Sequence, residues 1–302
     1  MIDHIDDFIA DQDWSLNTVS WVRRRLTIWF EYAEDKGLRL EGLSKGQFTR
    51  WLNQARREGL SYSSRNGMYN AVGQFSSWLQ DNGHIEGNCF TSTDKPKRPR
   101  KEKSVIGTVA KDYLIKMVTY AENDANPMNR RNAAILRVLT TTGMRRGECA
   151  NLATPDLDFA QSRITIRETK TGIDRVAILQ PETAYALRVW LQLKPKTKHD
   201  KVFVSLTPNK AGIYKPLRPD AINKIVDKMK CDAGIGAEVK ITPHMLRHTF
   251  ASTVVKGGNT FALMSLMGHS DVKTTEIYVH NDERELRRMA NYAPKIPINE
   301  GD

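Results

Sequence analysis

The sequence predicts a mainly α-helical protein with a small β-sheet, in which a helical N-terminal domain precedes a mixed α/β domain. The chain has 302 residues, 40% of them hydrophobic, which suits about two domains with sizeable cores. Apolar residues recur every three or four positions in many segments, as they do on amphipathic helices. Two short segments, 163–167 and 175–179, are instead expected to form strands.

The first 90 or so residues are predicted to form helices separated by short turns. Residues 17–36 have helical apolar spacing, and Gly37 is placed to end that helix. Ser44 and Gln47 match a capping box for a second helix, and a third helix ends before the turn at 82–83. The apolar positions of the three helices are Val19, Val22, Leu26, Trp29, Phe30 and Ala33, then Phe48, Trp51, Leu52 and Ala55, then Met68, Tyr69, Val72, Phe75, Trp78 and Leu79.

The segment DKPKRPRKEK, residues 94–103, combines two prolines with six basic residues. It cannot easily form a buried helix or a central strand, so we expect an extended linker. The predicted organisation is therefore an N-terminal domain at 1–92, a basic linker at 93–107, a second domain at 108–290 and a C-terminal tail at 291–302.

The second domain is predicted to mix helices with a hairpin. Helices are expected near 110–121, 130–142 and 181–193, and the chain after residue 216 is expected to be helical again up to 290. The two strands are joined by ETKTGID, in which Thr171-Gly172 suits a turn, so the hairpin should project Lys170 near its tip.

Basic residues outnumber acidic ones, 46 to 35, which gives a net charge of +11. This excess points to a polyanionic partner such as nucleic acid, although a basic but unspecialised surface would give the same totals. In the N-terminal domain a solvated basic face is an equally good explanation, and the linker could simply keep the domains apart. The candidate phosphate contacts are Arg23, Arg24, Arg56, Arg57, Arg65, Lys97, Arg98, Arg100 and Lys101.

Other classes of protein and site are disfavoured. The three cysteines, Cys89, Cys149 and Cys231, are widely separated and odd in number, which argues against a disulfide framework and for a reducing compartment. No apolar segment approaches the roughly 18 residues of a membrane span, and no signal peptide is apparent, so we expect a cytoplasmic protein. His244 and His248 have the spacing of a zinc pair but lack a third ligand.

Two motifs supply cations where chemistry on a phosphate would need them. Transfer of a phosphodiester to a side chain requires a nucleophile, cations around the non-bridging oxygens and a proton donor for the leaving oxygen. TTGMRRGECANL places Arg145 just after Gly143, at an expected junction between two helices. PHMLRHTFAS starts a helix at Pro243 and puts His244 and Arg247 one turn apart on one face. Either motif alone could arise by chance.

The order of the whole set is more specific. Arg145, Lys170, His244-x-x-Arg247, Met267-Gly268-His269 and, nine residues later, Tyr278 resemble the signature of the tyrosine recombinase, or phage integrase, family. The segment GHSDVKTTEIYVH looks like the family's nucleophile segment, and the resemblance covers essentially the whole chain. It implies a SAM-like, core-binding N-terminal domain followed by a catalytic domain. Met144 and Met267 stand where leucine is more usual, a change that conserves volume.

The resemblance assigns roles to five of these residues. Tyr278 would be the nucleophile that forms a 3′-phosphotyrosine. Arg145 and Arg247 would hold the scissile phosphate, since a guanidinium stays protonated and its fork matches two oxygens. His244 would accept or share the phenol proton, and His269 would donate a hydrogen bond to the phosphate.

Two further roles follow in the same way. Lys170 would protonate the leaving 5′ oxygen. The register of the predicted hairpin leaves Arg167 and Arg175 close to Lys170 in sequence, so this is the least secure assignment. Glu148 would orient Arg145 or a nearby helix, unless it is simply a surface charge.

The family also implies partners: double-stranded DNA with paired recombination half-sites, a homotetramer on synapsed DNA and a Holliday-junction intermediate, with accessory DNA-bending proteins as a further option. No metal or other cofactor is expected. The tail would pass to a neighbouring protomer. We expect integration or excision of a mobile element; the alternatives are a recombinase that resolves chromosome dimers, a type IB topoisomerase, a non-catalytic DNA-binding protein on the same fold, and a metal-dependent nuclease.

Overall fold

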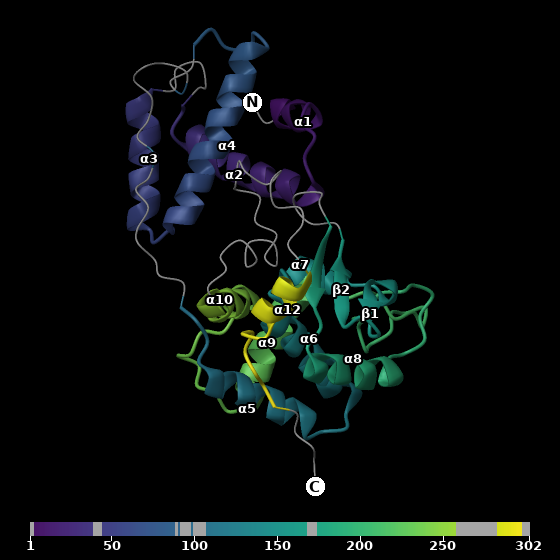
Figure 1. Ribbon diagram of the computed structural model, residues 1–302. Coiled ribbons are helices and arrows are strands. Elements are labelled where there is room, and N and C mark those ends of the chain that lie inside the picture. Colours follow the sequence, from purple (N-terminus) through teal and green to yellow (C-terminus); the bar gives the residue numbers. More distant parts are fainter. Residues whose placement is uncertain are drawn as a thin grey trace. The chain divides into compact units, whose positions relative to one another are not determined.

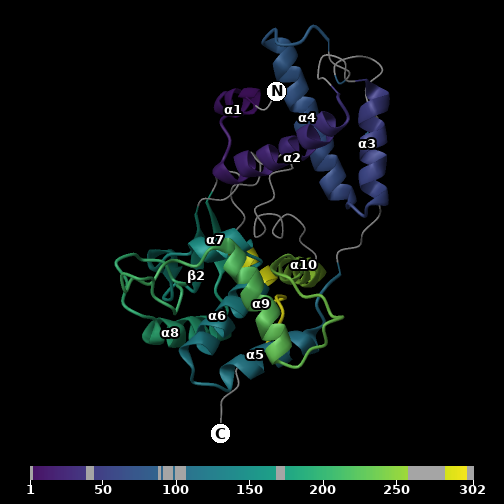
Figure 2. The same ribbon diagram turned by 180° about the vertical axis from the view of Figure 1, so that it is seen from behind.

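The computed structural model describes residues 3–38, 44–87, 90, 98, 107–167, 174–257 and 283–297. The chain divides into two compact units, Met1–Ser104 and Val105–Asp302 (Figures 1 and 2). The first unit is helical in its described part, whereas the second contains helices and a small antiparallel sheet, which confirms the predicted fold class. No helix in the described ranges has the length and apolar character that a membrane span requires.

Serine side chains cap the N-termini of three helices in the first unit. The Ser15 and Ser61 side chains accept hydrogen bonds from backbone N–H groups three residues later. Ser44 and Gln47 form the predicted capping box in both directions. The helices of this unit are α1 (Asp3–Ala10), α2 (Leu16–Asp35), α3 (Lys45–Arg57) and α4 (Tyr62–Asp81).

Aromatic side chains dominate the core of the first unit. Trp29 packs edge-on against Phe48 and Trp51, and Phe8 packs edge-on against Phe75. These side chains are almost fully buried and come from all four helices. The apolar spacing in the sequence therefore identified the buried faces of α2, α3 and α4, whereas α1 was not predicted.

Arg65 corrects one prediction for this unit. We expected it on the surface, but it is only 6% exposed, and its Nε donates a hydrogen bond to the Leu60 carbonyl at 3.1 Å. The guanidinium thus supplies a hydrogen bond to a backbone carbonyl just before α4, so the predicted surface position of Arg65 is wrong. Arg23, Arg24, Arg56 and Arg57 are exposed, and Arg23 pairs with Asp6.

The second unit is built around α6 (Pro127–Thr142), whose residues from Arg131 to Thr142 are all buried. It contacts five other helices, and both ribbon views show it among them (Figures 1 and 2). A helix that is buried on every side must satisfy its polar groups internally. The three threonines at 140–142 do so by donating to carbonyls four residues earlier. The helices around α6 are α5 (Lys111–Glu122), α7 (Arg146–Asn151), α8 (Pro181–Leu193), α9 (Pro219–Asp232) and α10 (Pro243–Val254).

A three-stranded antiparallel sheet completes this unit, in the order β1 (Leu157–Asp158), β2 (Arg163–Ile166) and β3 (Arg175–Ile178). The β2–β3 pairing confirms the expected hairpin, with Ile166 opposite Arg175 at the end nearest the connecting loop. β1 was not predicted, because two residues are too few to show an alternating pattern. Residues 168–173, including Lys170, lie outside the described ranges.

The last helix, α12 (Glu283–Ala290), and the segment after it pack on their own unit. Met289 and Ala293 form a small apolar cluster with Phe250 and Val254 of α10. Ile296 reaches the main core of the unit. Residues 291–297 thus contact their own chain.

Arg137 of α6 links α5 to this C-terminal segment. Its guanidinium forms a two-pronged ion pair with Glu122 at 2.6 and 2.8 Å, and both side chains are at least 95% buried. It also donates to the carbonyls of Ile296 and Pro297, each at 2.8 Å. One guanidinium therefore joins three segments of the unit.

The end of α6 depends on Gly143, whose φ of 63° is left-handed. A Cβ at this position would collide with the ring of Phe250 on α10. Glycine is therefore required here both for backbone conformation and for the close approach of α6 and α10.

The Arg137 ion pair predicts a large loss of stability on substitution. Arg137→Met would leave the Glu122 carboxylate buried without this guanidinium, so we expect a loss of about 3–5 kcal/mol in the free energy of unfolding, measured with urea. Lys228→Met is the control, because Lys228 pairs with Asp232 at the surface of α9 and should cost less than about 1 kcal/mol. Equal losses for the two variants would contradict this account.

Gly143 predicts a second, separable effect. Gly212 also has positive φ, 72°, but has open space around its Cβ position. Gly212→Ala should therefore cost about 1–2 kcal/mol from backbone strain alone. Gly143→Ala should cost about 1–3 kcal/mol more because of the Phe250 collision. Urea unfolding of both variants measures the difference, and the interpretation fails if they lose the same stability.

Candidate active site

Arg145 lies in the short connection between α6 and α7. Its backbone is extended, with φ −69° and ψ 151°, at the N-cap position of α7. The Arg145 N–H donates to Oε2 of Glu148 at 2.8 Å, and a terminal guanidinium nitrogen donates to Oε1 of the same carboxylate, also at 2.8 Å. Glu148 therefore fixes both the backbone and the side chain of Arg145.

Arg247 reaches the same connection from α10. Its side chain is buried and donates a hydrogen bond to the Gly143 carbonyl, two residues before Arg145. Thr249, two residues further along α10, anchors the helix by accepting a hydrogen bond from the Val109 N–H at 2.8 Å. The fold thus brings together two arginines that are far apart in the sequence.

The charges in this region influence one another. Burial, followed by repulsion from Arg145 and Arg175, lowers the pKa of Arg247 to about 10, with Glu148 opposing the shift. Burial alone would raise the pKa of Glu148. Attraction to Arg175 and the hydrogen bonds from Arg145 outweigh burial, so the net pKa is lowered. The carboxylate is therefore ionised at neutral pH.

Arg175 was not among the predicted site residues. It is the first residue of β3, 8% exposed, and a terminal nitrogen of its guanidinium donates to Oε2 of Glu148 at 2.7 Å. A signal was present in the sequence, because Arg175 shares the face of β3 that also carries the buried Ala177. A charge at an inward position needs a partner of opposite sign.

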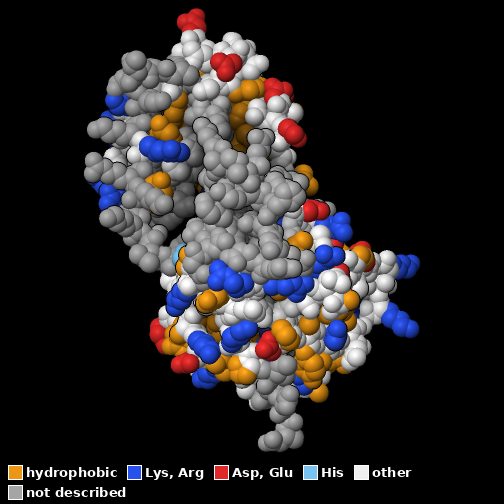
Figure 3. Space-filling model, viewed as in Figure 1, with side chains coloured by type: hydrophobic (Ala, Val, Ile, Leu, Met, Phe, Trp, Pro, Cys, Tyr) orange, Lys and Arg blue, Asp and Glu red, His pale blue; other side chains and the backbone are white. Residues whose placement is uncertain are grey.

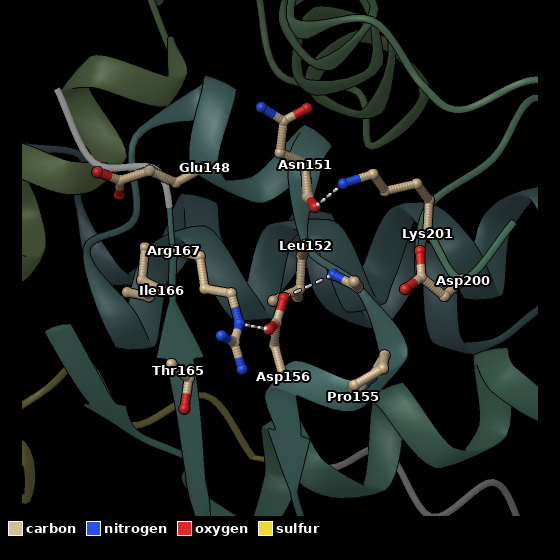
Figure 4. A pocket seen from close by; sticks show the side chains of 11 residues that line it. Glu148, Asn151, Leu152, Pro155, Asp156, Thr165, Ile166, Arg167, Asp200 and Lys201 are labelled. Atoms are coloured by element: carbon tan, nitrogen blue, oxygen red, sulfur yellow. Dashed lines mark hydrogen bonds and ion pairs between the residues drawn. The ribbon is translucent and has the colours of Figure 1, made fainter. Parts of the chain in front are cut away.

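A pocket of about 330 Å³ adjoins Glu148 on the side of α7 and β2 (Figure 4). On its wall Asp156 accepts hydrogen bonds from Arg167 Nε at 2.6 Å and from the Ala153 N–H at 3.0 Å. Asp156 ends a short 3-10 turn, Thr154–Asp156. Arg167, directly after β2, thus pairs with Asp156, and Arg175, at the start of β3, pairs with Glu148 of α7.

His244 lies on α10 one turn before Arg247, with its side chain exposed. The ring of His248 instead lies 3.3 Å from the Ser252 hydroxyl. Over the described ranges, His, Cys, Asp and Glu nowhere gather in groups of three that could hold a metal ion.

The other predicted residues divide into two sets. Arg98 is described, and its guanidinium donates to the side-chain oxygens of Asn66 and Asn70 on α4 at 2.8 and 3.0 Å. The remaining residues lie outside the described ranges: Lys97, Arg100, Lys101, Lys170, His269 and Tyr278.

The described part of the site can bind an anion with two oxygens available for contact. Three guanidiniums and one carboxylate leave two positive charges in the cluster, and guanidinium forks match phosphate oxygens. Lys and Arg side chains also outnumber Asp and Glu on the face of the second unit in Figure 3. A phosphodiester is the anion that both features favour.

Comparison with known proteins gives the family. Residues 108–285 match the Phage integrase family, and residues 3–83 match the Phage integrase, N-terminal SAM-like domain. The tyrosine recombinase XerC of Oceanobacillus iheyensis is 28% identical over 94% of this chain and 93% of its own length. The tyrosine recombinase XerA of Saccharolobus solfataricus is 32% identical over 75% of this chain and 68% of its own length.

Solved structures share the fold. XerH site-specific recombinase, crystallised with palindromic difH substrate in a post-cleavage complex, has a TM-score of 0.70 at 21% identity and covers 96% of this chain and 84% of its own. A lambda integrase dimer bound to a COC′ core site has a TM-score of 0.66 at 17% identity, covering 94% and 95%. The two arginines, their carboxylate and the matched domains lead to one conclusion: the chain belongs to the phage integrase family and is a tyrosine-type site-specific recombinase.

Proposed function

We propose that this recombinase cuts and rejoins DNA through a 3′-phosphotyrosine formed by Tyr278, without a metal or nucleotide cofactor. The observation that carries the proposal is the meeting of Arg145 and Arg247 at the end of α6, where Gly143 and Glu148 hold them. Two guanidiniums fixed in advance can stabilise charge on the non-bridging oxygens as the phosphorus becomes five-coordinate.

In the proposed cleavage step the phenol oxygen of Tyr278 attacks phosphorus, and the bond from phosphorus to the 5′ oxygen breaks. A free phenol has a pKa near 10, so only about one in 10³ is ionised at neutral pH. His244 accepts the phenol proton during attack, and its exposed position on α10 leaves the ring accessible. Lys170 donates a proton to the departing 5′ oxygen, and His269 donates a hydrogen bond to the phosphate.

Rejoining is the reverse of cleavage with a different strand. A 5′ hydroxyl attacks the phosphotyrosine, its proton returns to the base that Lys170 has become, and Tyr278 recovers its proton. The phosphotyrosine conserves the energy of the phosphodiester, so the reaction needs no ATP. Neither step calls for a divalent ion, in contrast to nucleases that gather carboxylates around metals.

Four protomers would synapse two DNA sites, exchange one pair of strands, pass through a Holliday junction and exchange the second pair. Relatives crystallised on recombination-site DNA support paired half-sites as the substrate. The exposed arginines of α2 and α3, together with the basic linker, would contact the phosphate backbone. Arg65 is left out of this set because it is buried.

The proposed biological task is integration or excision of a mobile element. Plasmids that carry two directly repeated sites on one circle, or one site on each of two circles, separate the options. Recombination between circles supports integration. Recombination confined to repeated sites on one circle would instead favour excision or the resolution of chromosome dimers.

Trapping on a nicked suicide substrate tests the chemistry. A short fragment released after cleavage prevents rejoining, so the wild-type chain should accumulate a covalent DNA adduct whose modified peptide contains Tyr278. Tyr278→Phe should bind DNA and form no adduct, and Arg145→Ala should slow cleavage by about 10²-fold or more. A chelator should leave the wild-type rate unchanged. Adducts that persist in Tyr278→Phe, or cleavage that stops with chelator, would refute the proposal.

Glu148→Gln keeps the shape of the side chain but removes its charge and one acceptor oxygen. We expect cleavage on the same substrate to slow by about 10- to 100-fold, because the two guanidiniums donate to different oxygens and an amide offers only one. An unchanged rate for a folded variant would show that the carboxylate does not support the site.

The same variant predicts a pH effect on stability. Burial raises the pKa of Glu148, but Arg175 and Arg145 together lower it by more than burial raises it, so its folded pKa lies below the ordinary 4.5. Such a group stabilises the fold above its unfolded pKa and loses this contribution as pH falls through its folded pKa. The difference in unfolding free energy between wild type and Glu148→Gln should therefore shrink below pH 4.5. Urea titrations across that range measure it, and a difference independent of pH would contradict the prediction.

A further inference from the structure

Arg175 is a buried cation next to the site, and the mechanism proposed above does not use it. Its side chain is 7% exposed, which is too enclosed for direct contact with a DNA backbone, and it pairs with a Glu148 side chain that is 5% exposed. Burial lowers the pKa of Arg175, and Glu148 opposes that shift. An arginine removed from water in this way is retained only where its hydrogen bonds and charge pairing compensate.

The two carboxylate oxygens of Glu148 accept hydrogen bonds from different donors. Oε1 accepts from the Arg145 guanidinium at 2.8 Å. Oε2 accepts from the Arg145 backbone N–H at 2.8 Å and from Arg175 at 2.7 Å. Arg175 therefore binds the oxygen that also holds the Arg145 backbone, and it restricts rotation of the carboxylate that aims the Arg145 side chain.

Arg175 also joins two elements that carry different parts of the site. It starts β3, whose partner strand β2 ends at Ile166 opposite it, whereas Glu148 belongs to α7. The Arg175–Glu148 pair is thus a direct link between the sheet and the helix that follows Arg145. The charge of Arg175 also influences Arg247. Burial lowers the pKa of Arg247 most, followed by repulsion from Arg145 and then by repulsion from Arg175.

We propose that Arg175 is a positioning residue for the strand-cleavage reaction, which acts through Glu148 to hold Arg145 against the scissile phosphate without touching DNA. The inference rests on the proposed function, in which Arg145 binds that phosphate. Loss of Arg175 frees the carboxylate to reorient, and a displacement of about 1 Å at a catalytic group can cost on the order of 10²-fold in rate.

The test measures cleavage in a single turnover at saturating protein, on the nicked suicide substrate, together with DNA affinity and the folded fraction. Arg175→Met should slow cleavage by about 10- to 100-fold per folded molecule while DNA affinity changes by less than about 2-fold. Arg175→Lys, which keeps the charge beside Glu148, should recover to within about 5-fold of wild type. Arg163→Met is the matched control, since Arg163 starts the neighbouring strand β2 but pairs with Asp158 at the surface, and its cleavage rate should be unchanged.

A comparison of single and double variants separates an effect on cleavage that acts through Glu148 from a nonspecific structural effect of the substitution. If Arg175 acts through Glu148, adding Arg175→Met to Glu148→Gln should slow cleavage by less than about 2-fold beyond Glu148→Gln alone. The proposal would be overturned if Arg175→Met slowed cleavage by the same factor in the Glu148→Gln variant as in the wild-type chain. A folded Arg175→Met that cleaves at the wild-type rate would also overturn it.

If Arg175→Met does not fold, Arg175→Gln carries the same test, because it keeps a donor toward Glu148 without the charge. It should slow cleavage by about 5- to 10-fold, and a wild-type rate would overturn the proposal. The wild-type adduct is measured first in each series. Its absence at Tyr278 would refute the proposed function, whereas a normal wild-type adduct with an unaffected Arg175 variant would refute this inference alone.

Discussion

The buried carboxylate of Glu148 is the interaction that makes a cluster of arginines possible in this fold. Burial, followed by repulsion from Arg145 and Arg175, lowers the pKa of Arg247, so each further cation here is costly unless a carboxylate opposes it. Glu148 offsets one of the three charges and receives hydrogen bonds from Arg145 and Arg175. Two positive charges remain in the cluster. In the proposed mechanism, a phosphodiester attacked by a phenolate carries two negative charges in all, so the cluster would suit the transition state better than the bound substrate.

Helix α6 supplies the rigid frame for this cluster. Because it is buried on every side, its position is set by packing against five helices rather than by contact with solvent. Its last turn ends at Gly143, whose carbonyl receives Arg247 and whose chain continues directly to Arg145. The helix that forms the centre of the core thus also determines the spacing of Arg145 and Arg247, the two arginines proposed to bind phosphate.

Regular helices with clear end signals were well predicted from the sequence. The helix at 181–193 has the predicted bounds, and the capping box at Ser44 is present, because spacing and caps are local properties. What sequence could not give is the environment of long cationic side chains. Arg65 was assigned to the surface and Arg175 was passed over, since the burial of each depends on a partner that the fold brings close.

In the candidate site, too, local sequence signals were predictive and contacts between distant residues were not. Arg145 and Arg247 were selected through the order of family motifs, whereas their junction at Gly143 became visible only in three dimensions. No periodicity in the sequence could indicate that the carbonyl of one motif would receive the side chain of another. The roles of Lys170, His269 and Tyr278 rest on motif order and are part of the proposed function.

Arg137 has a consequence for how the C-terminal segment can evolve. It holds that segment through the main-chain carbonyls of Ile296 and Pro297, groups that every residue type possesses. Side-chain identity is constrained mainly at Ala293, which packs against Phe250 and Val254, and at Ile296, which enters the core. Peptides of quite different sequence could therefore bind in this position, provided that they present two consecutive carbonyls and suitable apolar side chains at these two places. Such tolerance would let the tail of one chain serve another whose sequence had diverged.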